Sequence, residues 1–341
     1  MKSAIPVSDF LSTSSDGIVL DVRSPAEFEK GHIPNAISFP IFNNKERAEL
    51  GTLYKNEGKQ VAILRGLEIV GPKLKDFVLQ VNTLRVDKPV YLYCWRGGMR
   101  SGSMQILLST AGIPCQTLVG GYKSYRNFIL KALSFPYKFK VIGGKTGSGK
   151  SEVLRAMHNL GAQIIDLEAL ANHKGSAFGK LGENPQPSTE HFANCLYHAI
   201  KDLDANRTIW IEDESQTIGQ IFIPPIFYLN YRKSPLFVLE IPFETRVDHL
   251  VKIYGNSEID PIKEAFNRIG KKLGGQHLKQ AIIHIENGEK REAAAIALKY
   301  YDKTYSYGLE HKHTTEIRNI SFEDFNANHI ANRLLETENG I

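Results

Sequence analysis

The fold is decided by the stretch Gly144-Lys145-Thr146-Gly147-Ser148-Gly149-Lys150-Ser151, which fits the phosphate-loop pattern G-x-x-x-x-G-K-[ST] in full. Glycines let such a loop curl so that several backbone N–H groups point at a phosphate, at the start of the next helix. Lys150 adds a positive charge, and Ser151 can place its hydroxyl on a magnesium ion. A strand pattern over 137–143 and a helical pattern to about Leu160 flank the loop. We therefore expect a strand–loop–helix unit that binds a diphosphate-bearing molecule, rather than an ordinary glycine-rich turn.

A carboxylate at the end of a second strand normally completes a phosphate-loop site by holding the water shell of the metal. Residues 209–215 read Ile-Trp-Ile-Glu-Asp-Glu-Ser, an apolar strand pattern that runs into acidic residues. We predict that Glu212 and Asp213 are the acidic residues of this site, with a possible Mg²⁺ near Ser151. The alternative is that these carboxylates only form a solvated strand end.

A second reactive loop, Cys94-Trp95-Arg96-Gly97-Gly98-Met99-Arg100-Ser101, follows the apolar run 89–93 and precedes a helical pattern. The loop amides and the N-terminus of that helix favour a negative charge on the cysteine. Arg96 and Arg100 would stabilise the Cys94 thiolate and any anion delivered to it. Such a loop suits transfer of sulfur or selenium through a Cys-bound chalcogen, or phosphate-ester hydrolysis through a Cys-bound phosphate. The spacing of cysteine and arginine does not separate these two chemistries.

Strand and helix patterns alternate along the chain, which predicts an α/β protein with parallel sheets covered by helices. A first domain over 1–134 contains the cysteine loop and a polar, helix-favouring insertion at 43–88. The pattern restarts near Pro136, so we expect a domain of the P-loop NTPase type over 135–257. Residues 258–341 are charged and helix-favouring, and we expect a helical extension of that second domain.

The composition is that of a soluble globular protein, because 42% of the residues are hydrophobic and 23% are charged. The first six residues contain no long apolar core, so we expect no secretory signal. No apolar run approaches the roughly 18 residues of a membrane span. Cys94, Cys115 and Cys195 are too scattered for a disulfide framework or a zinc cluster. We expect a cytoplasmic protein without a tightly bound cofactor.

Segments upstream of Cys94 decide between sulfur chemistry and phosphatase chemistry. Residues 21–28, Asp-Val-Arg-Ser-Pro-Ala-Glu-Phe, and 31–36, Gly-His-Ile-Pro-Asn-Ala, resemble the signature of rhodanese domains, although Asn35 replaces a frequent glycine. Together with further matching segments, the order of motifs resembles that of the tRNA 2-selenouridine synthase family. These segments are 46–55, 67–73, the Cys94 loop, the phosphate loop, 210–215 and Tyr-Tyr-Asp-Lys-Thr-Tyr at 300–305. The resemblance implies a rhodanese-like domain followed by a P-loop domain.

The resemblance also implies a reaction. Selenium from selenophosphate replaces the C2 sulfur of 2-thiouridine at the wobble position, position 34, of tRNA. Family members also transfer a geranyl group from geranyl diphosphate onto that sulfur, and the S-alkylated sulfur can then depart as a thiol. From diphosphate chemistry we assign geranyl diphosphate to the loop 144–151, and we assign selenium to Cys94. The implied partners are the anticodon region of tRNA and a selenophosphate synthase.

Two alternatives stay open from the residues alone. In the first, Cys94 and Arg100 form a phosphatase site and the P-loop domain is regulatory; release of phosphate from an aryl phosphate would support it. In the second, a P-loop kinase or an RNA-binding module carries a rhodanese-like domain only as a scaffold. Nucleotide hydrolysis that survives loss of Cys94 would favour this second alternative.

Most of the excess positive charge lies in one segment. Residues 262–313 contain ten Lys or Arg and six Asp or Glu, which is +4 of the net charge of +5. Arg268, Lys271 and Lys272 within the basic segment 263–312 are our candidates for tRNA contacts, and a solvated helix face is the alternative. Tyrosines could stack on unpaired bases there, or could be core residues of a helical subdomain. These tyrosines are Tyr300, Tyr301, Tyr305 and Tyr307.

Overall fold

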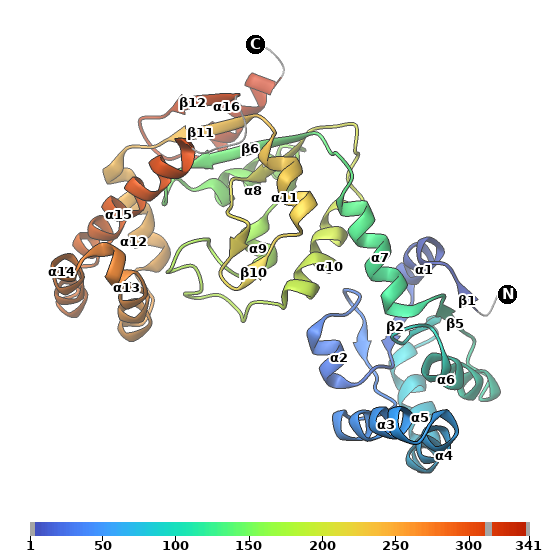
Figure 1. Cartoon of the computed structure of the whole chain (residues 1–341). Helices are drawn as coiled ribbons and strands as arrows, with labels where there is room; N and C mark the ends of the chain where they lie inside the picture. Colours follow the sequence, from blue (N-terminus) through green and yellow to red (C-terminus); the bar gives the residue numbers. More distant parts are fainter. Residues whose placement is uncertain (1–3, 311–315, 339–341) are drawn as a thin grey trace. The chain divides into compact units, whose positions relative to one another are not determined.

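The computed structural model describes residues 4–310 and 316–338. The chain folds as two compact units, Met1–Ala132 and Leu133–Ile341 (Figure 1). The division falls within α7 (Gly121–Leu133), close to the position expected from the restart of the sequence pattern. Among the described residues, no helix is long and apolar enough to cross a membrane.

The first unit contains a five-stranded sheet with the strand order β1-β5-β4-β2-β3, and every pair is parallel. The strands are β1 (Ala4–Ile5), β2 (Ile18–Asp21), β3 (Ile37–Ser38), β4 (Val90–Tyr93) and β5 (Cys115–Leu118). In the register of β2 and β4, Asp21 lies opposite Tyr93. The carboxyl ends of the two central strands therefore lie together, and both functional segments of this domain, 22–28 and 94–101, start there.

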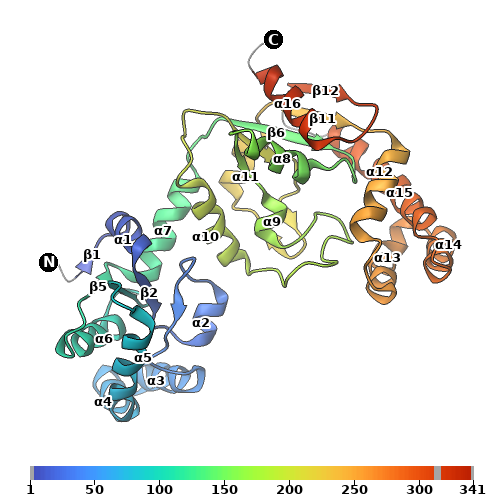
Figure 2. The same cartoon turned by 180° about the vertical axis from the view of Figure 1, so that it is seen from behind.

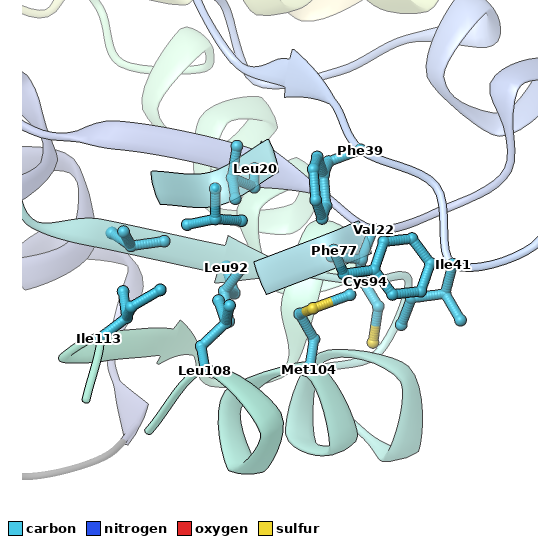
Figure 3. Close-up of a cluster of buried hydrophobic side chains, with 12 residues drawn as sticks. Leu20, Val22, Phe39, Ile41, Phe77, Leu92, Cys94, Met104, Leu108 and Ile113 are labelled. Carbon is cyan, nitrogen blue, oxygen red and sulfur yellow. The ribbon is translucent and has the colours of Figure 1, made fainter. Parts of the chain in front are cut away.

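Helices cover this sheet: α1 (Val7–Thr13), α2 (Pro25–Lys30), α3 (Asn44–Asn56), α4 (Lys59–Val70), α5 (Leu74–Arg85), α6 (Met99–Thr110) and α7. The insertion expected at 43–88 consists of α3, α4 and α5. Side chains of the sheet and of α6, among them Leu92 and Leu108, are buried in one apolar cluster (Figure 3). Cys94 belongs to this cluster and lies at its edge beside Met104 and Ile41 (Figure 3).

The second unit contains a parallel sheet with the order β12-β11-β6-β8-β7. Its strands are β6 (Phe139–Gly144), β7 (Gln163–Ile165), β8 (Ile209–Glu212), β11 (Leu236–Glu240) and β12 (Ile317–Ser321), and a short antiparallel pair is formed by β9 (Thr217–Ile218) and β10 (Ile221–Phe222). Ile142 pairs with Glu212 in the register of β6 and β8. The phosphate loop and the acidic end of β8 therefore lie at the same edge of the sheet.

The helices of this unit are α8 (Lys150–Asn159), α9 (Leu167–Ala171), α10 (Thr189–Ile200), α11 (Pro225–Arg232), α12 (Phe243–Tyr254), α13 (Ile259–Leu273), α14 (Gly275–Glu286), α15 (Lys290–Glu310) and α16 (Ala327–Glu338). A core cluster that contains Ile142, Trp210 and Phe237 joins the sheet to α8 and α16. Helices α12 to α15 lie together in both views (Figures 1 and 2), and a second cluster around Phe266 packs α13, α14 and α15.

The region 258–341 is helical as expected, with α13 to α16, and it also contains one strand, β12, that the sequence did not predict. Residues 317–321, Ile-Arg-Asn-Ile-Ser, pair along their whole length with β11 as an edge strand. Four of the five residues are exposed, and Ile320 alone packs on the core. An edge strand of this kind lacks the continuous apolar run that identifies a buried parallel strand.

Candidate functional site

The phosphate loop joins the end of β6 to the start of α8. Its glycines are required by geometry, since Gly149 has φ of 72° and a Cβ there would lie 2.2 Å from the ring of Phe325. A side chain at this position would therefore clash with Phe325, which lies just before α16. The loop has the strand–loop–helix setting that the sequence predicted, since it runs from the end of β6 into the N-terminus of α8, where an anion would be favoured.

Two side chains from distant parts of the chain form hydrogen bonds with the backbone of the phosphate loop. The N–H of Gly144 donates a hydrogen bond of 2.8 Å to the hydroxyl of Tyr305 on α15. Arg246 of α12, which is 3% exposed, donates to the carbonyl of Thr146 and forms a bidentate pair with Asp302 of α15. Residues of the segment 300–305 thus fix the backbone of the phosphate loop.

These contacts bear on the expected base-stacking tyrosines. Tyr305 accepts from Gly144, and the hydroxyl of Tyr301 accepts a 3.0 Å hydrogen bond from the N–H of Ala177. For both side chains the structure favours the core-residue alternative. Tyr307 is 68% exposed.

A group of three carboxylates faces the loop. Oxygen atoms of Glu168, Glu212 and Glu214 all lie within 4.8 Å of one another. Ser151 donates a 2.7 Å hydrogen bond to Glu168, and the N–H of Glu168 donates to Glu212 at 3.3 Å. The group comes from α9, from β8 and from the segment after β8, which surround the start of α8.

Burial and mutual repulsion control the charge of this group. Glu212 is fully buried, and burial together with the charge of Glu168 raises its pKa well above the ordinary range. The same two causes raise the pKa of Glu214 to about 8. Burial would lower the pKa of Lys150, but the nearby carboxylates outweigh it, so that this pKa lies above its ordinary value. Lys150 is therefore held as a cation. Its single positive charge is too little for all three carboxyl groups to ionise at the same time.

The donor set fits a magnesium ion. Mg²⁺ prefers oxygen ligands, usually one or two carboxylates together with phosphate oxygens and water. Two buried oxygens here, Glu212 Oε1 and Ser148 Oγ, have no hydrogen-bond partner among the described residues. Glu168, Glu212, Glu214 and the Ser151 hydroxyl are the groups that could hold such an ion.

The two predicted acidic residues have different surroundings. Glu212 lies in the carboxylate group, whereas Asp213 pairs with Arg232 at 3.3 Å and lines the cavity onto which the phosphate loop opens. Sequence reasoning missed Glu168 and Glu214. Glu168 follows β7 by three residues, so the rule that led to Glu212, a carboxylate after a strand of the sheet, could also have found it.

The phosphate loop opens on a pocket of about 650 Å³, a size typical of ligand sites. Its wall contains Lys150, carboxylates that include Glu168 and Glu214, and three further cations, Arg155, Lys174 and Arg232. The pocket therefore combines a cradle for an anion with carboxylates that can bind a cation.

The cysteine loop begins directly after β4, and Cys94 is 3% exposed. Burial would raise the pKa of its thiol. Hydrogen bonds from the hydroxyl and N–H of Ser101 and from the N–H of Gly98, together with the charge of Arg100, outweigh burial and lower the pKa of Cys94. The loop stabilises the thiolate, as the sequence predicted.

The backbone of this loop packs on the first turn of α7. A Cβ at Gly121, where φ is 58°, would lie 2.3 Å from the carbonyl oxygen of Cys94. The N–H groups of Tyr122 and Lys123 donate to the carbonyls of Cys94 and Trp95. These contacts fix the direction in which the loop amides point.

The two arginines of the loop have different surroundings. Arg100 is partly buried and forms a bidentate pair with Glu27 of α2, at 2.7 and 3.2 Å. Arg96 is exposed and makes no side-chain hydrogen bond or ion pair within the described part of the chain. Arg96 is therefore available to an incoming anion, whereas Arg100 acts from a fixed position.

The rhodanese-like signature has a structural role around this loop. Arg23 forms a buried ion pair with Asp21 at 2.6 Å, donates to the carbonyl of Gly31 and lies over the ring of Tyr122. Glu27 completes a capping box with Ser24 at the start of α2, besides its pair with Arg100. The signature residues thus connect α2, the cysteine loop and α7.

The candidate tRNA-contacting residues lie on α13. Lys271 and Lys272 are exposed in its last turn, and Arg268 is exposed but donates to the carbonyl of Ala177. The opposite face of α13 is buried through Phe266 and its neighbours. Residues 311 and 312, the end of the basic segment, lie outside the described residues.

These two sites define the class of protein, in which a rhodanese-like domain with an activated cysteine precedes a P-loop domain. A family model of the rhodanese-like domain matches residues 7–128, and a model of the tRNA 2-selenouridine synthase AAA domain matches residues 137–332.

Similarity to curated proteins identifies the family within this class. The sequence is 33% identical to the tRNA 2-selenouridine synthase of Bdellovibrio bacteriovorus, over 87% of this chain and 90% of the relative. It is 34% identical to the protein of the same name from a Sulfurovum species, over 89% of this chain and 92% of the relative. It is 38% identical to that from Nitrosomonas europaea, over 87% of this chain and 90% of the relative. The chain belongs to the tRNA 2-selenouridine synthase family.

Proposed function

We propose that this protein replaces the C2 sulfur of wobble 2-thiouridine in tRNA by selenium, in two steps that use its two sites. The observation that carries the proposal is that a chain of this family contains two loops suited to anions, one in each domain. One is the phosphate loop with its carboxylates, and the other is the loop that stabilises the Cys94 thiolate.

The first step is S-geranylation in the pocket of the P-loop domain. The loop 144–151 and the ammonium of Lys150 bind the diphosphate of geranyl diphosphate and stabilise its charge as it leaves. The thiocarbonyl sulfur bonds to C1 of the geranyl group, the C1–O bond breaks, and the N3 proton of the base passes to water. A magnesium ion held by Ser151, Glu168 and Glu214 would neutralise part of the diphosphate charge.

The second step introduces selenium and uses Cys94. Selenophosphate carries selenium at the level of selenide, so the exchange needs neither an oxidant nor a reductant. Attack of the Cys94 thiolate on phosphorus breaks the P–Se bond and leaves selenide and a phosphocysteine, which water hydrolyses to phosphate. Selenide then bonds to C2 while the C2–S bond breaks, and geranylthiol leaves. Arg96 is free to bind the phosphate oxygens of the donor.

The proposal is tested with the full chain and tRNA that carries 2-thiouridine at the wobble position, read out by mass spectrometry of the nucleosides. Geranyl diphosphate alone should give S-geranyl-2-thiouridine. Addition of selenophosphate should convert it to 2-selenouridine with release of geranylthiol. Formation of 2-selenouridine at an unchanged rate without geranyl diphosphate would contradict the two-step scheme.

A further inference from the structure

A second, smaller cavity of about 60 Å³ adjoins the phosphate pocket. The two cavities share a rim formed by Thr146 of the phosphate loop and four other residues: Ser176, Leu250, Tyr254 and Tyr301. Beyond the rim the smaller cavity extends among α12, α13, α14 and α15. If a molecule binds the phosphate loop through a charged group at one end, its other end can therefore extend across the rim into this cavity.

Small side chains on one side of α15 leave this space open. Ala293, Ala294 and Ala297 line the cavity opposite Phe266 of α13 and Ile285 of α14. Protein interiors are otherwise close-packed, and larger side chains at the three alanine positions would fill the space. The cavity lies within the apolar cluster of α13, α14 and α15.

Beyond its rim the cavity has, among the described residues, no hydrogen-bonding side chain available to a polar ligand. Its hydroxyl-bearing side chains are those of the shared rim. The ammonium of Lys290, which also lines it, donates to the carbonyl of Gly255. A purine base or a ribose placed there would lose its hydrogen bonds to water without replacement, which is costly. A hydrocarbon gains from the same burial.

We propose that this cavity binds the distal isoprene unit of a prenyl diphosphate whose diphosphate lies on the loop 144–151; this inference rests on the proposed function. A water-sized group needs about 10–15 Å³ of such space, so about 60 Å³ holds roughly four to six groups, close to the five carbons of one isoprene unit. The unit next to the diphosphate crosses the rim between Leu250 and Tyr301. Two units, a geranyl chain, fill the available length, and a third has no space.

The test measures affinities of the full chain for inorganic diphosphate and for dimethylallyl, geranyl and farnesyl diphosphate by isothermal titration calorimetry. Geranyl diphosphate should bind on the order of 100-fold more tightly than inorganic diphosphate, because about one isoprene unit becomes buried. Dimethylallyl diphosphate ends at the rim and should gain little. Farnesyl diphosphate should bind more weakly than geranyl diphosphate.

Ala294→Leu adds carbon atoms inside the cavity and should remove most of the gain for geranyl diphosphate, while the affinity for inorganic diphosphate stays within about two-fold. Ala295→Leu is the matched control, because Ala295 is the next residue on α15 and does not line the cavity. Thermal unfolding of both variants checks the fold, and the ligand series on the unchanged protein tests the cavity independently.

Two kinds of failure are distinguishable. If geranyl diphosphate does not bind, or binds equally well to Lys150→Ala, the ligand assignment of the proposed function is wrong and the tail site falls with it. If binding depends on Lys150 but geranyl and inorganic diphosphate have equal affinities, only the tail site is overturned. The tail site would also be overturned if the Ala294→Leu variant still bound geranyl diphosphate as much more tightly than inorganic diphosphate as the unchanged protein does.

Discussion

Replacement of Lys150 by alanine should separate the two proposed steps. The Lys150 ammonium lies among Glu168, Glu212 and Glu214, whose charges raise its pKa. The substitution removes the charged donor that faces the phosphates and leaves the three carboxylates beside the diphosphate without their cation. Both changes weaken binding of the anion, and neither alters the cysteine loop of the other domain.

The magnitude follows from these contacts. A hydrogen bond to a charged group contributes about 1.5–3 kcal/mol. The raised pKa values of Glu212 and Glu214 let these carboxyls take up protons, which limits the added repulsion. We expect a total loss of about 3 kcal/mol, which is a roughly 100-fold weaker affinity for geranyl diphosphate.

The assay is titration calorimetry with geranyl diphosphate, followed by nucleoside mass spectrometry with 2-thiouridine tRNA. Lys150→Ala should lose S-geranylation, and tRNA that already carries S-geranyl-2-thiouridine should restore selenation. Lys145→Ala is the matched control, because this loop lysine does not line the pocket and should change the affinity by less than about three-fold. Geranylation by Lys150→Ala at the parental rate would refute the assignment of the diphosphate to this loop.

Three further predictions concern the cysteine loop and α13. Cys94→Ser should abolish selenation and keep S-geranylation within about two-fold, since a serine hydroxyl is a far weaker nucleophile; 2-selenouridine formed by this variant would contradict the role of the thiolate. Ser101→Ala should raise the pKa of Cys94, because it removes the strongest of the hydrogen bonds that lower it, so the thiolate absorbance in the ultraviolet should appear at higher pH; an unchanged titration would refute this cause. Reversal of Arg268, Lys271 and Lys272 to glutamate should weaken tRNA binding and reduce its salt dependence by about one to three units of slope, without effect on diphosphate binding; an unaltered salt titration would place the RNA site elsewhere.

The sequence predicted both reactive loops because each depends on neighbouring residues. A strand, a short loop of fixed spacing and a helix place Cys94 directly after β4 and Lys150 at the start of α8, and no long-range contact is needed for that. Glu212 could be predicted for the same reason, because its position at the end of β8 depends only on neighbouring residues. The order of these motifs was also enough for the family resemblance.

The remaining features depend on contacts between distant residues. Glu168 joins Glu212 and Glu214 because β7 and β8 are neighbours in the sheet, and Asp213 pairs with Arg232, 19 residues further along the chain. The hydrogen bond from Gly144 to Tyr305 spans 161 positions. Strand β12 has few buried residues, so its apolar pattern carried no signal.

Helix α15 connects the two parts of the proposed prenyl site. Asp302 and Tyr305 contact the phosphate loop, directly or through Arg246, and Ala294 lies in the apolar cavity. From Ala294 to Asp302 is eight residues, which corresponds to about 12 Å along the helix axis. One rigid element therefore sets the distance between the diphosphate cradle and the tail cavity. A larger side chain in place of Ala294 would shorten the tail that fits without disturbing the loop, because Asp302 and Tyr305 lie about two and about three turns away on the helix. Chain-length specificity and diphosphate binding should thus be separable by substitutions in a single helix.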